Sequence, residues 1–438
     1  MDPFFVKAIQ LILSLSILIV LHELGHFIPA KLFKTRVEKF YLFFDVKFSL
    51  FKKKIGETTY GIGWLPLGGY VKISGMIDES MDKEQMAKPP EPWEFRSKPT
   101  WQRLIIMLGG VTVNIILGFL IYTLILFNYG RDFVTPETMP DGFAVHESFK
   151  EMGFQDGDQI LKVNGEPFEN VTDINKYLLL RDVTTVEVLH QNGSTETISV
   201  PEDIGMTNFK AGILEPFVPL VNPVIDVVAP DSPAEKAGLQ KEDRIVFVNG
   251  EETNFWHEFT QKVKSSTDEP VSLVVERNGE IINFDIKPDE NNVIGVAPLL
   301  NFDVVHKKYT LWESITQGSS FGYDILRDYV AQFKYVFTQE GATQVGGFGA
   351  IGNLFPDTWD WYSFWMTTAF ISIILAFMNI LPIPALDGGH VVFLLYEMVS
   401  GRKPNEKVME YAQMIGFFIL IALVLFANGN DVYRWLFG

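Results

Sequence analysis

The chain has 438 residues, a hydrophobic content of 47% and a formal net charge of −18 at pH 7. It contains no cysteine, which excludes disulfide bonds and thiolate metal ligands and leaves imidazole and oxygen groups for any metal. Its basic residues gather beside long apolar runs, where anionic lipid is a simpler partner than a polyanion. We therefore expect a lipid bilayer, and no nucleic acid, among its partners.

The first apolar run, residues 8–33, contains His22, Glu23 and His26 in a His-Glu-x-x-His motif. Residues four apart share one face of a helix, so both imidazoles can reach one zinc ion while Glu23 stands beside its water. Ionisable side chains are costly in hydrocarbon and mark function by default. We expect a transmembrane helix within residues 1–33, not a cleaved signal peptide, because no small-residue cleavage site precedes the motif.

A basic segment follows at residues 34–102. Between residues 31 and 54, eight lysines and arginines stand against two acidic residues, and short basic loops stay in the cytoplasm. Within this cytoplasmic loop, glycines, a proline and apolar alternation at 60–72 predict a β-hairpin that dips into the membrane interface. The alternative is an ordinary cytoplasmic hairpin anchored by Trp64 and Tyr70.

An uncharged apolar run at 104–127 predicts the second transmembrane helix at 103–128, and the acidic segment after it is duplicated. Two copies, at 129–218 and 219–302, match at a spacing of 85 residues. The matching residues are Gly153, Asp158, Ile160, Val163, Asn164 and Gly165, and then Gly238, Asp243, Ile245, Val248, Asn249 and Gly250. The stretch 227–239 resembles the circularly permuted PDZ domains of bacterial proteases, which bind extended peptides at a sheet edge. A steric filter that binds no specific peptide is an equal alternative.

The rest of the chain predicts an amphipathic helical segment on the outer side at 303–360 and two more transmembrane helices. These helices are expected at 361–390 and 411–428, the second being just long enough to span with little tilt. The glycine-rich stretch at 346–349 lacks the lysine and hydroxyl residues of a phosphate loop and receives no role.

A catalytic zinc held by two histidines needs a third protein ligand. Asp387 is the leading candidate, because two prolines just before it predict an unwound segment that Gly388 and Gly389 would allow to take unusual backbone angles. Irregular backbone at membrane depth is tolerated where it is buried in protein or lines a cavity. His390 is the rival ligand, although a supporting role suits it better. The other histidines lie in the outer segment, at His146, His190, His257 and His306.

These motifs together resemble a known family. The His-Glu-x-x-His motif in the first span, and Asn-x-x-Pro-x-Pro-x-x-Asp-Gly in the third, resemble the site-2 protease family of intramembrane metalloproteases. The two PDZ-like copies resemble its RseP branch, the regulator of sigma-E protease. The resemblance implies His22, His26 and Asp387 as zinc ligands, Glu23 as catalytic base and Asn379 as a substrate-binding residue. A helix-packing hydrogen bond is the alternative role for Asn379.

The expected fold is therefore a polytopic α-helical membrane protein with four transmembrane helices, a membrane-associated β-hairpin and two tandem PDZ domains. Since the loop between the last two spans is also basic, both termini and the PDZ domains should be periplasmic, and the active site should lie near the cytoplasmic side of a bacterial inner membrane.

The resemblance implies zinc-dependent cleavage of single-span membrane proteins, such as anti-sigma factors already shortened by another protease, or remnant signal peptides. A non-catalytic PDZ scaffold is the first alternative, although a relic has no reason to keep four polar groups in hydrocarbon. A metal or proton transporter is the second, but no inverted repeat is visible. The sequence specifies neither the cleavage site nor the oligomeric state.

Overall fold

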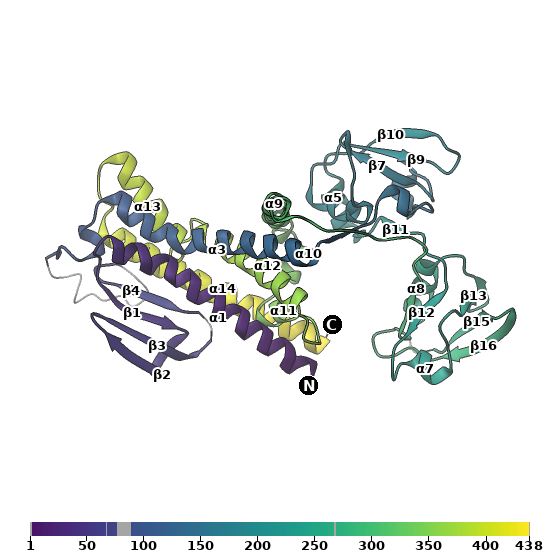
Figure 1. Cartoon of the computed structure of the whole chain (residues 1–438), viewed down its shortest axis with the longest axis horizontal. Coiled ribbons are helices and arrows are strands. Elements are labelled where there is room, and N and C mark those ends of the chain that lie inside the picture. The colour runs from purple at the N-terminus through teal and green to yellow at the C-terminus, as the bar shows by residue number, and fades with distance from the viewer. Residues whose placement is uncertain (1, 67, 77–88, 267–268, 438) are drawn as a thin grey trace. The chain divides into compact units, whose positions relative to one another are not determined.

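The computed structural model describes residues 2–66, 68–76, 89–266 and 269–437. The chain forms two compact units (Figure 1). The helical unit comprises residues 1–130 and 308–438, and the inserted unit comprises Arg131–Lys307. Residue 67 of the expected hairpin and residues 77–88 of the expected cytoplasmic loop lie outside the described residues.

Four helices among the described residues are long and apolar enough to cross a membrane, so the chain is a membrane protein with additional β-sheets. They are α1 (Pro3–Leu32), α3 (Thr100–Tyr129), α12 (Trp361–Ile380) and α14 (Glu406–Phe437). The start of α1 is well defined, because the Asp2 carboxylate accepts a hydrogen bond of 2.8 Å from the Phe4 amide and proline occupies the first turn.

The remaining helices of this unit are α9 (Leu311–Val336), α10 (Gln339–Gln344), α11 (Phe348–Gly352) and α13 (Asp387–Ser400). At the start of α9, Thr310 and Glu313 form a capping box. This helix packs closely on α3, because a Cβ atom at Gly318 would lie 2.7 Å from the backbone of Thr123.

The helices α1 and α3 lie side by side and are in close contact beside the site (Figure 1). A Cβ atom added to Gly25 would lie 2.4 Å from the backbone oxygen of Gly109. A Cβ atom added to Gly109 would lie even closer to the backbone oxygen of Gly25. Small residues let membrane helices approach in this way. The buried apolar residues beside this contact include Ala30, Ile106 and Met107, which pack on the sheet described next and on α13.

A four-stranded sheet follows α1 and has the order β2-β3-β1-β4. Its strands are β1 (Val37–Leu42), β2 (Phe44–Ile55), β3 (Thr58–Leu65) and β4 (Tyr70–Ile73). The prediction of a hairpin at 60–72 was wrong, because β3 and β4 both pair with β1, which lies between them. Strand β1 lies between β3 and β4, and its buried Tyr41 ring stacks on Tyr70 and covers Gly61.

The third apolar run is two helices, not one, because α12 ends at Ile380 and α13 begins at Asp387. The unwound segment between them was predicted from its prolines, but the unusual backbone angle belongs to Ala385, at φ +78°. Gly388 and Gly389 are helical. They are needed for space, because a Cβ at Gly388 would meet the Ile380 oxygen at 2.3 Å, and one at Gly389 would meet the Ile383 oxygen at 2.7 Å.

The inserted unit contains the same arrangement of strands twice. The first copy has a sheet of order β10-β9-β7-β8 and a β11-β6 pair, and the second has a sheet of order β16-β15-β13-β14 and a β12-β17 pair. The strands of the first copy are β6 (Phe143–Val145), β7 (Gln159–Val163), β8 (Glu166–Pro167), β9 (Thr185–Leu189), β10 (Thr195–Ser199) and β11 (Phe217–Pro219). Those of the second are β12 (Ile225–Val228), β13 (Arg244–Val248), β14 (Glu251–Glu252), β15 (Val271–Arg277), β16 (Glu280–Ile286) and β17 (Val296–Pro298).

Short helices complete each copy. They are α4 (Glu147–Lys150), α5 (Ile174–Leu180) and α6 (Ile204–Lys210) in the first copy, and α7 (Pro233–Ala237) and α8 (Trp256–Ser265) in the second. At the repeat spacing α4 and α5 match α7 and α8, whereas α6 has no counterpart among the described residues of the second copy. A further strand pair, β5 (Arg131–Phe133) with β18 (Val305–Lys307), joins the two ends of the unit. Each copy has its own buried apolar core, so the internal repeat seen in the sequence corresponds to a repeated fold.

Candidate metal centre

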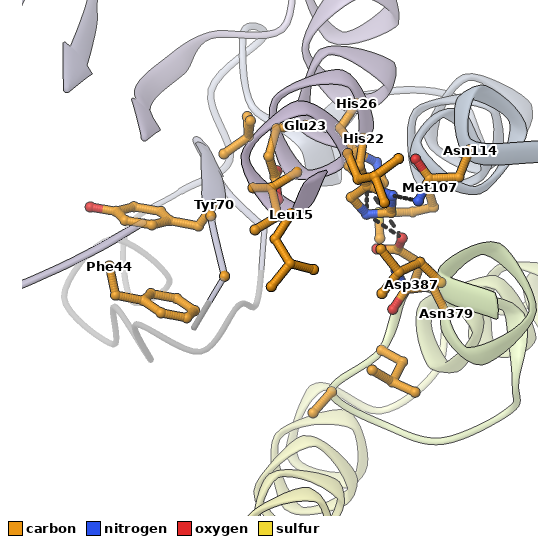
Figure 2. Close-up of a pocket in the computed structure, with 18 of the residues that line it drawn as sticks. Leu15, His22, Glu23, His26, Phe44, Tyr70, Met107, Asn114, Asn379 and Asp387 are labelled. Atoms are coloured by element: carbon orange, nitrogen blue, oxygen red, sulfur yellow. Dashed lines mark hydrogen bonds and ion pairs between the residues drawn. The ribbon is translucent and has the colours of Figure 1, made fainter. Parts of the chain in front are cut away.

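Two imidazoles of α1 face the same point, one helical turn apart (Figure 2). The Nε2 atoms of His22 and His26 are 3.2 Å apart, and His26 is 7% exposed. The helix α3 packs directly against the two imidazoles because residue 110 is a glycine. A Cβ atom at Gly110 would lie 2.4 Å from His26 Nε2 and 2.5 Å from His22 Cε1.

Asp387 reaches the same point from a distant part of the sequence (Figure 2). It is the first residue of α13, directly after the unwound segment. That segment is held by α14, because the Ala385 amide donates a hydrogen bond of 3.2 Å to Gln413 Oε1. Gly416, one turn along α14, lies against Pro384 with no room for a side chain. The backbone before the carboxylate is therefore fixed on two sides.

The three groups fit a zinc ion. Asp387 Oδ2 lies 3.3 Å from the Nε2 atom of His22 and 3.3 Å from that of His26. Tetrahedral zinc with bonds of about 2.0–2.1 Å requires ligand atoms about 3.3–3.4 Å apart. In addition, Asp387 Oδ2 is buried with no hydrogen-bond partner, as expected for an atom whose partner is a cation. Imidazole and carboxylate ligands leave the fourth zinc position open in catalytic sites.

Glu23 lines the same cavity as the three candidate ligands. The cavity has a volume of about 770 Å³ and also opens beside Gly69, Tyr70 and Val71 of the sheet. The backbone amide of Val71 donates a hydrogen bond to the Glu23 carboxylate, and a Cβ atom at Gly69 would be 3.5 Å from Glu23 Cγ. The sheet thus holds the carboxylate from the side opposite α3, and a glycine leaves room for it.

The other residues singled out in the sequence fall into two groups. Asn379, in the last turn of α12, and His390, in the first turn of α13, both line the cavity. His390 does not belong to the three-residue cluster found among the described residues. The four remaining histidines all belong to the inserted unit, at His146, His190, His257 and His306.

The sequence analysis did not identify three residues of the site. Asn114 of α3 is fully buried with its side-chain Nδ2 atom 3.2 Å from His22 Nδ1. Gln413 and Gly110, described above, hold the Asp387 segment and make space for the imidazoles. A polar signal existed for Asn114, because an amide inside an uncharged apolar run is costly without a partner. Gly110 carried no comparable signal, since glycines are common in membrane helices.

Comparisons with known proteins show which family the chain belongs to. The family model described as Peptidase family M50 matches residues 10–423. The chain is 28% identical to the "Regulator of sigma E protease" of Haemophilus influenzae, over 97% of this chain and 98% of that protein. It is also 28% identical to the "Regulator of sigma-E protease RseP" of Escherichia coli K12, over 97% of both chains, and 27% identical to a "Putative zinc metalloprotease" of Vibrio cholerae, over 97% and 98%. The chain, which carries a cluster of two histidines and an aspartate that could hold a metal, belongs to peptidase family M50, the site-2 proteases.

Proposed function

We propose that the chain is a zinc-dependent intramembrane endopeptidase that cuts the spanning segments of single-span membrane proteins. The observation that carries this proposal is the set of three ligand atoms at tetrahedral spacing, beside a glutamate and among helices apolar enough to cross a bilayer. A zinc ion held by His22, His26 and Asp387 would supply Lewis-acid activation of water and of a peptide carbonyl.

Glu23 is the proton carrier in this mechanism. Its carboxylate takes the proton of the attacking water and returns it to the amine that leaves when the peptide bond breaks. The hydrogen bond from the Val71 amide keeps the side chain at the wall of the cavity. Asn379, on another wall, has donor and acceptor atoms suited to the backbone of an extended substrate.

The substrate has to be extended, because the carbonyl of a helical residue is already hydrogen-bonded and shielded. The strand β4 is an edge of its sheet, and its residues Tyr70–Ile73 line the cavity. Edge strands pair readily with another chain. We infer that an unwound substrate segment adds to β4 and passes Glu23, which the same strand holds.

The orientation follows from the basic loops. We infer that the end of the helical unit near Lys34 faces the cytoplasm. Lys98 Nζ donates to the Lys34 oxygen at 3.2 Å, and Lys403 Nζ donates to the Arg96 oxygen at 3.3 Å. The two lysine-rich loops therefore share one end of the unit, and such loops stay in the cytoplasm of a bacterial inner membrane.

The opposite end of the helical unit carries both termini. Lys7 near the N-terminus is 2.8 Å from Asp357, and Asp431 near the C-terminus accepts a hydrogen bond of 3.0 Å from the Gly347 amide. At this end the last residue of α3, Tyr129, also contacts Tyr362. These contacts support a periplasmic position for the termini and for the connection to the inserted unit.

We infer that the two copies of the inserted unit are PDZ domains that admit only substrates without a bulky outer domain. The second copy also has a groove of about 380 Å³ between α8 and β17, lined by Phe259, Val263, Ile294 and Val296. Such a groove suits an extended apolar peptide. Anti-sigma factors already shortened by another protease, and remnant signal peptides, are the substrate classes that fit this filter.

The Glu23→Gln variant tests the mechanism. The variant keeps the size and hydrogen-bonding capacity of the side chain but cannot carry the proton, so it should bind zinc as the parent does and leave a co-expressed, truncated single-span substrate uncut. Zinc content of the purified proteins and the amount of cut substrate are the measurements. Glu57→Gln, an exposed glutamate in the turn between β2 and β3, is the control and should cut normally.

Cleavage by Glu23→Gln at the parental rate would remove Glu23 as the proton carrier. A parent protein that neither retains zinc nor cuts the substrate would favour the non-catalytic scaffold instead. Zinc or proton flux that depends on His22 in the absence of any cleavage would favour a transporter.

A further inference from the structure

The buried side chain of Asn114 has one amide atom with a partner and one without (Figure 2). Its Nδ2 atom lies 3.2 Å from His22 Nδ1, whereas its Oδ1 atom is buried with no hydrogen-bond partner. Leaving such an atom unpaired is energetically costly. Asn114 is also fully buried, so solvent cannot satisfy the oxygen. This orientation of the Asn114 amide is therefore unfavourable, because it leaves the Oδ1 atom without a hydrogen bond.

The neighbouring ligand shows which arrangement a metal requires. His26 Nδ1 is 2.8 Å from the backbone oxygen of Ile106 on α3. A carbonyl oxygen only accepts hydrogen bonds, so His26 Nδ1 must carry the proton. In the neutral ring its Nε2 atom then has a free lone pair directed at Asp387. The helix α3 thus fixes this imidazole in the form that can bind a metal.

His22 needs the same form. Its Nε2 atom, which is 3.3 Å from Asp387 Oδ2, must offer a lone pair to a metal, so its proton must be on Nδ1. An Nδ1–H group facing the Asn114 NH2 group would be two donors in opposition. A half-turn of the amide exchanges Nδ2 and Oδ1 within the same space. After that half-turn, the unpaired oxygen accepts the hydrogen bond from His22.

We propose that Asn114 is a positioning residue for zinc, whose Oδ1 atom accepts a hydrogen bond from His22 Nδ1–H in the metal-bound protein. The inference rests on the proposed function only in taking His22 as a ligand. Zinc binding at Nε2 requires the one proton of the neutral His22 ring to be on Nδ1, where the Asn114 oxygen can accept its hydrogen bond.

The backbone of Asn114 is placed so that the amide can do this. Its carbonyl oxygen accepts a hydrogen bond of 2.7 Å from Ser372 Oγ on α12, and Gly110, one turn earlier, abuts both imidazoles. Three helices therefore fix the distance between the amide and His22. Groups that hold metal-binding histidines in this way change metal affinity by about 10–100-fold when they are removed.

Two substitutions separate the acceptor role from mere packing. Asn114→Leu keeps the approximate volume without polar atoms, and Asn114→Asp keeps the acceptor while removing the donor. We expect Asn114→Leu to bind zinc about 10–100-fold more weakly than the parent, and Asn114→Asp to bind it within a few-fold of the parent. The measurement is the zinc dissociation constant of the full-length protein in detergent, obtained by competition with a chelator.

Thr368→Val is the matched control. Thr368 is another fully buried polar residue between membrane helices, and its hydroxyl is 3.0 Å from Ser14 Oγ, on α1. We expect this variant to lower thermal stability without changing the zinc dissociation constant. A merely structural role for Asn114 would produce the same pattern at position 114.

The outcomes are distinct. If Asn114→Asp binds zinc as weakly as Asn114→Leu, Asn114 does not act as an acceptor, and if Asn114→Leu binds like the parent, it has no positioning role. In both cases Glu23-dependent cleavage by the parent would leave the proposed function standing. If Asn114→Leu does not fold, Asn114→Asp alone tests the proposal. If residue 114 had to donate a hydrogen bond to His22, this variant would lose zinc affinity, because an ionised aspartate has no donor. A parent protein that does not bind zinc overturns both proposals.

Discussion

At the scale of single residues, the metal centre depends on the absence of side chains as much as on their presence. The two imidazoles of α1 fit against α3 only because position 110 has no Cβ, and the two helices meet at Gly25 and Gly109. At each of these positions glycine lowers the helix propensity but lets α1 and α3 approach each other closely. The chemistry of the ligands is local to the motif, but their geometry is set by glycines on another helix.

Substitution of Gly110 by alanine tests this dependence. The added Cβ would lie 2.4 Å from His26 Nε2, so the ring must shift by several tenths of an ångström or more. A displacement of about 1 Å can reduce catalysis by about 100-fold. We expect Gly110→Ala to lose zinc affinity and most of its cleavage activity, as measured by chelator competition and substrate cutting.

The matched control is Gly429→Ala on α14, where no atom lies within 4 Å of the added Cβ. That variant should bind zinc and cut substrate like the parent. Equal zinc affinity in Gly110→Ala and Gly429→Ala would mean that the contact between α3 and the histidines has no part in metal binding.

At the scale of secondary-structure elements, α13 brings Asp387 to the histidines and is fixed at both ends. The unwound segment before it is held by Gln413 and Gly416 of α14. Near its other end, Glu397 forms a buried ion pair with Arg103 of α3, with a distance of 2.5 Å between Oε1 and Nη2. Thr100 donates a second hydrogen bond to the same oxygen at 3.0 Å. The helix that carries the third candidate ligand is thus anchored to the helix that lines the other two.

The buried ion pair between Arg103 and Glu397 predicts how single and double substitutions change the stability of the protein. Each of its side chains is about 10% exposed, so removing one charge leaves the other buried and unpaired. Glu397→Leu should destabilise the protein by about 3–5 kcal/mol, whereas Arg103→Met together with Glu397→Leu should recover most of that loss. The midpoint of thermal unfolding in detergent would measure both effects. A double variant no more stable than Glu397→Leu would contradict this account.

At the scale of the whole molecule, the chain combines a helical unit that contains every residue of the candidate site with an inserted unit built from two copies of one fold. Each copy has a buried aspartate that accepts a hydrogen bond of 2.8 Å from an amide three residues earlier, at Asp158 and Asp243. The charge partners differ. His190 is 2.6 Å from Asp158, and Arg277 is 2.6 Å from Asp243, at matching positions after β9 and at the end of β15.

This difference makes the first copy sensitive to pH. The hydrogen bond with Asp158 raises the pKa of His190 above its usual value of about 6.5, and Glu196 adds to the effect. A raised pKa stabilises the folded state fully below pH 6.5, and this contribution is lost as the pH rises through the folded-state pKa. The free energy of unfolding of the inserted unit should therefore fall as the pH rises above about 6.5.

Exchanging the partners tests this prediction within one chain. His190→Arg should remove the fall in stability, because arginine stays charged, whereas Arg277→His should introduce a second one. Resistance of the full-length protein to pulse proteolysis in urea, measured at pH 6 and pH 9 relative to the parent, reports both changes. The same pH dependence in the parent and in His190→Arg would exclude His190 as its source.

The local features of this protein could be predicted from its sequence. Helix periodicity alone places His22 and His26 on one face, and apolar runs of sufficient length identify the helices that can cross a membrane. The spacing of matching residues likewise indicated the duplication, which the repeated strand order reflects. These features depend on residues close in sequence or on direct self-similarity.

Only the tertiary structure decided how distant segments meet. Strand pairing is non-local, so nothing in 60–72 indicated that β1 would lie between the two expected hairpin strands. The atom that faces His22, the glycine that admits both imidazoles and the glutamine that holds the segment before Asp387 are likewise set by helix packing. The sequence by itself determined which chemical groups are available to a metal, and packing determined the distances between them, because those distances depend on contacts among residues from tens to hundreds of positions apart.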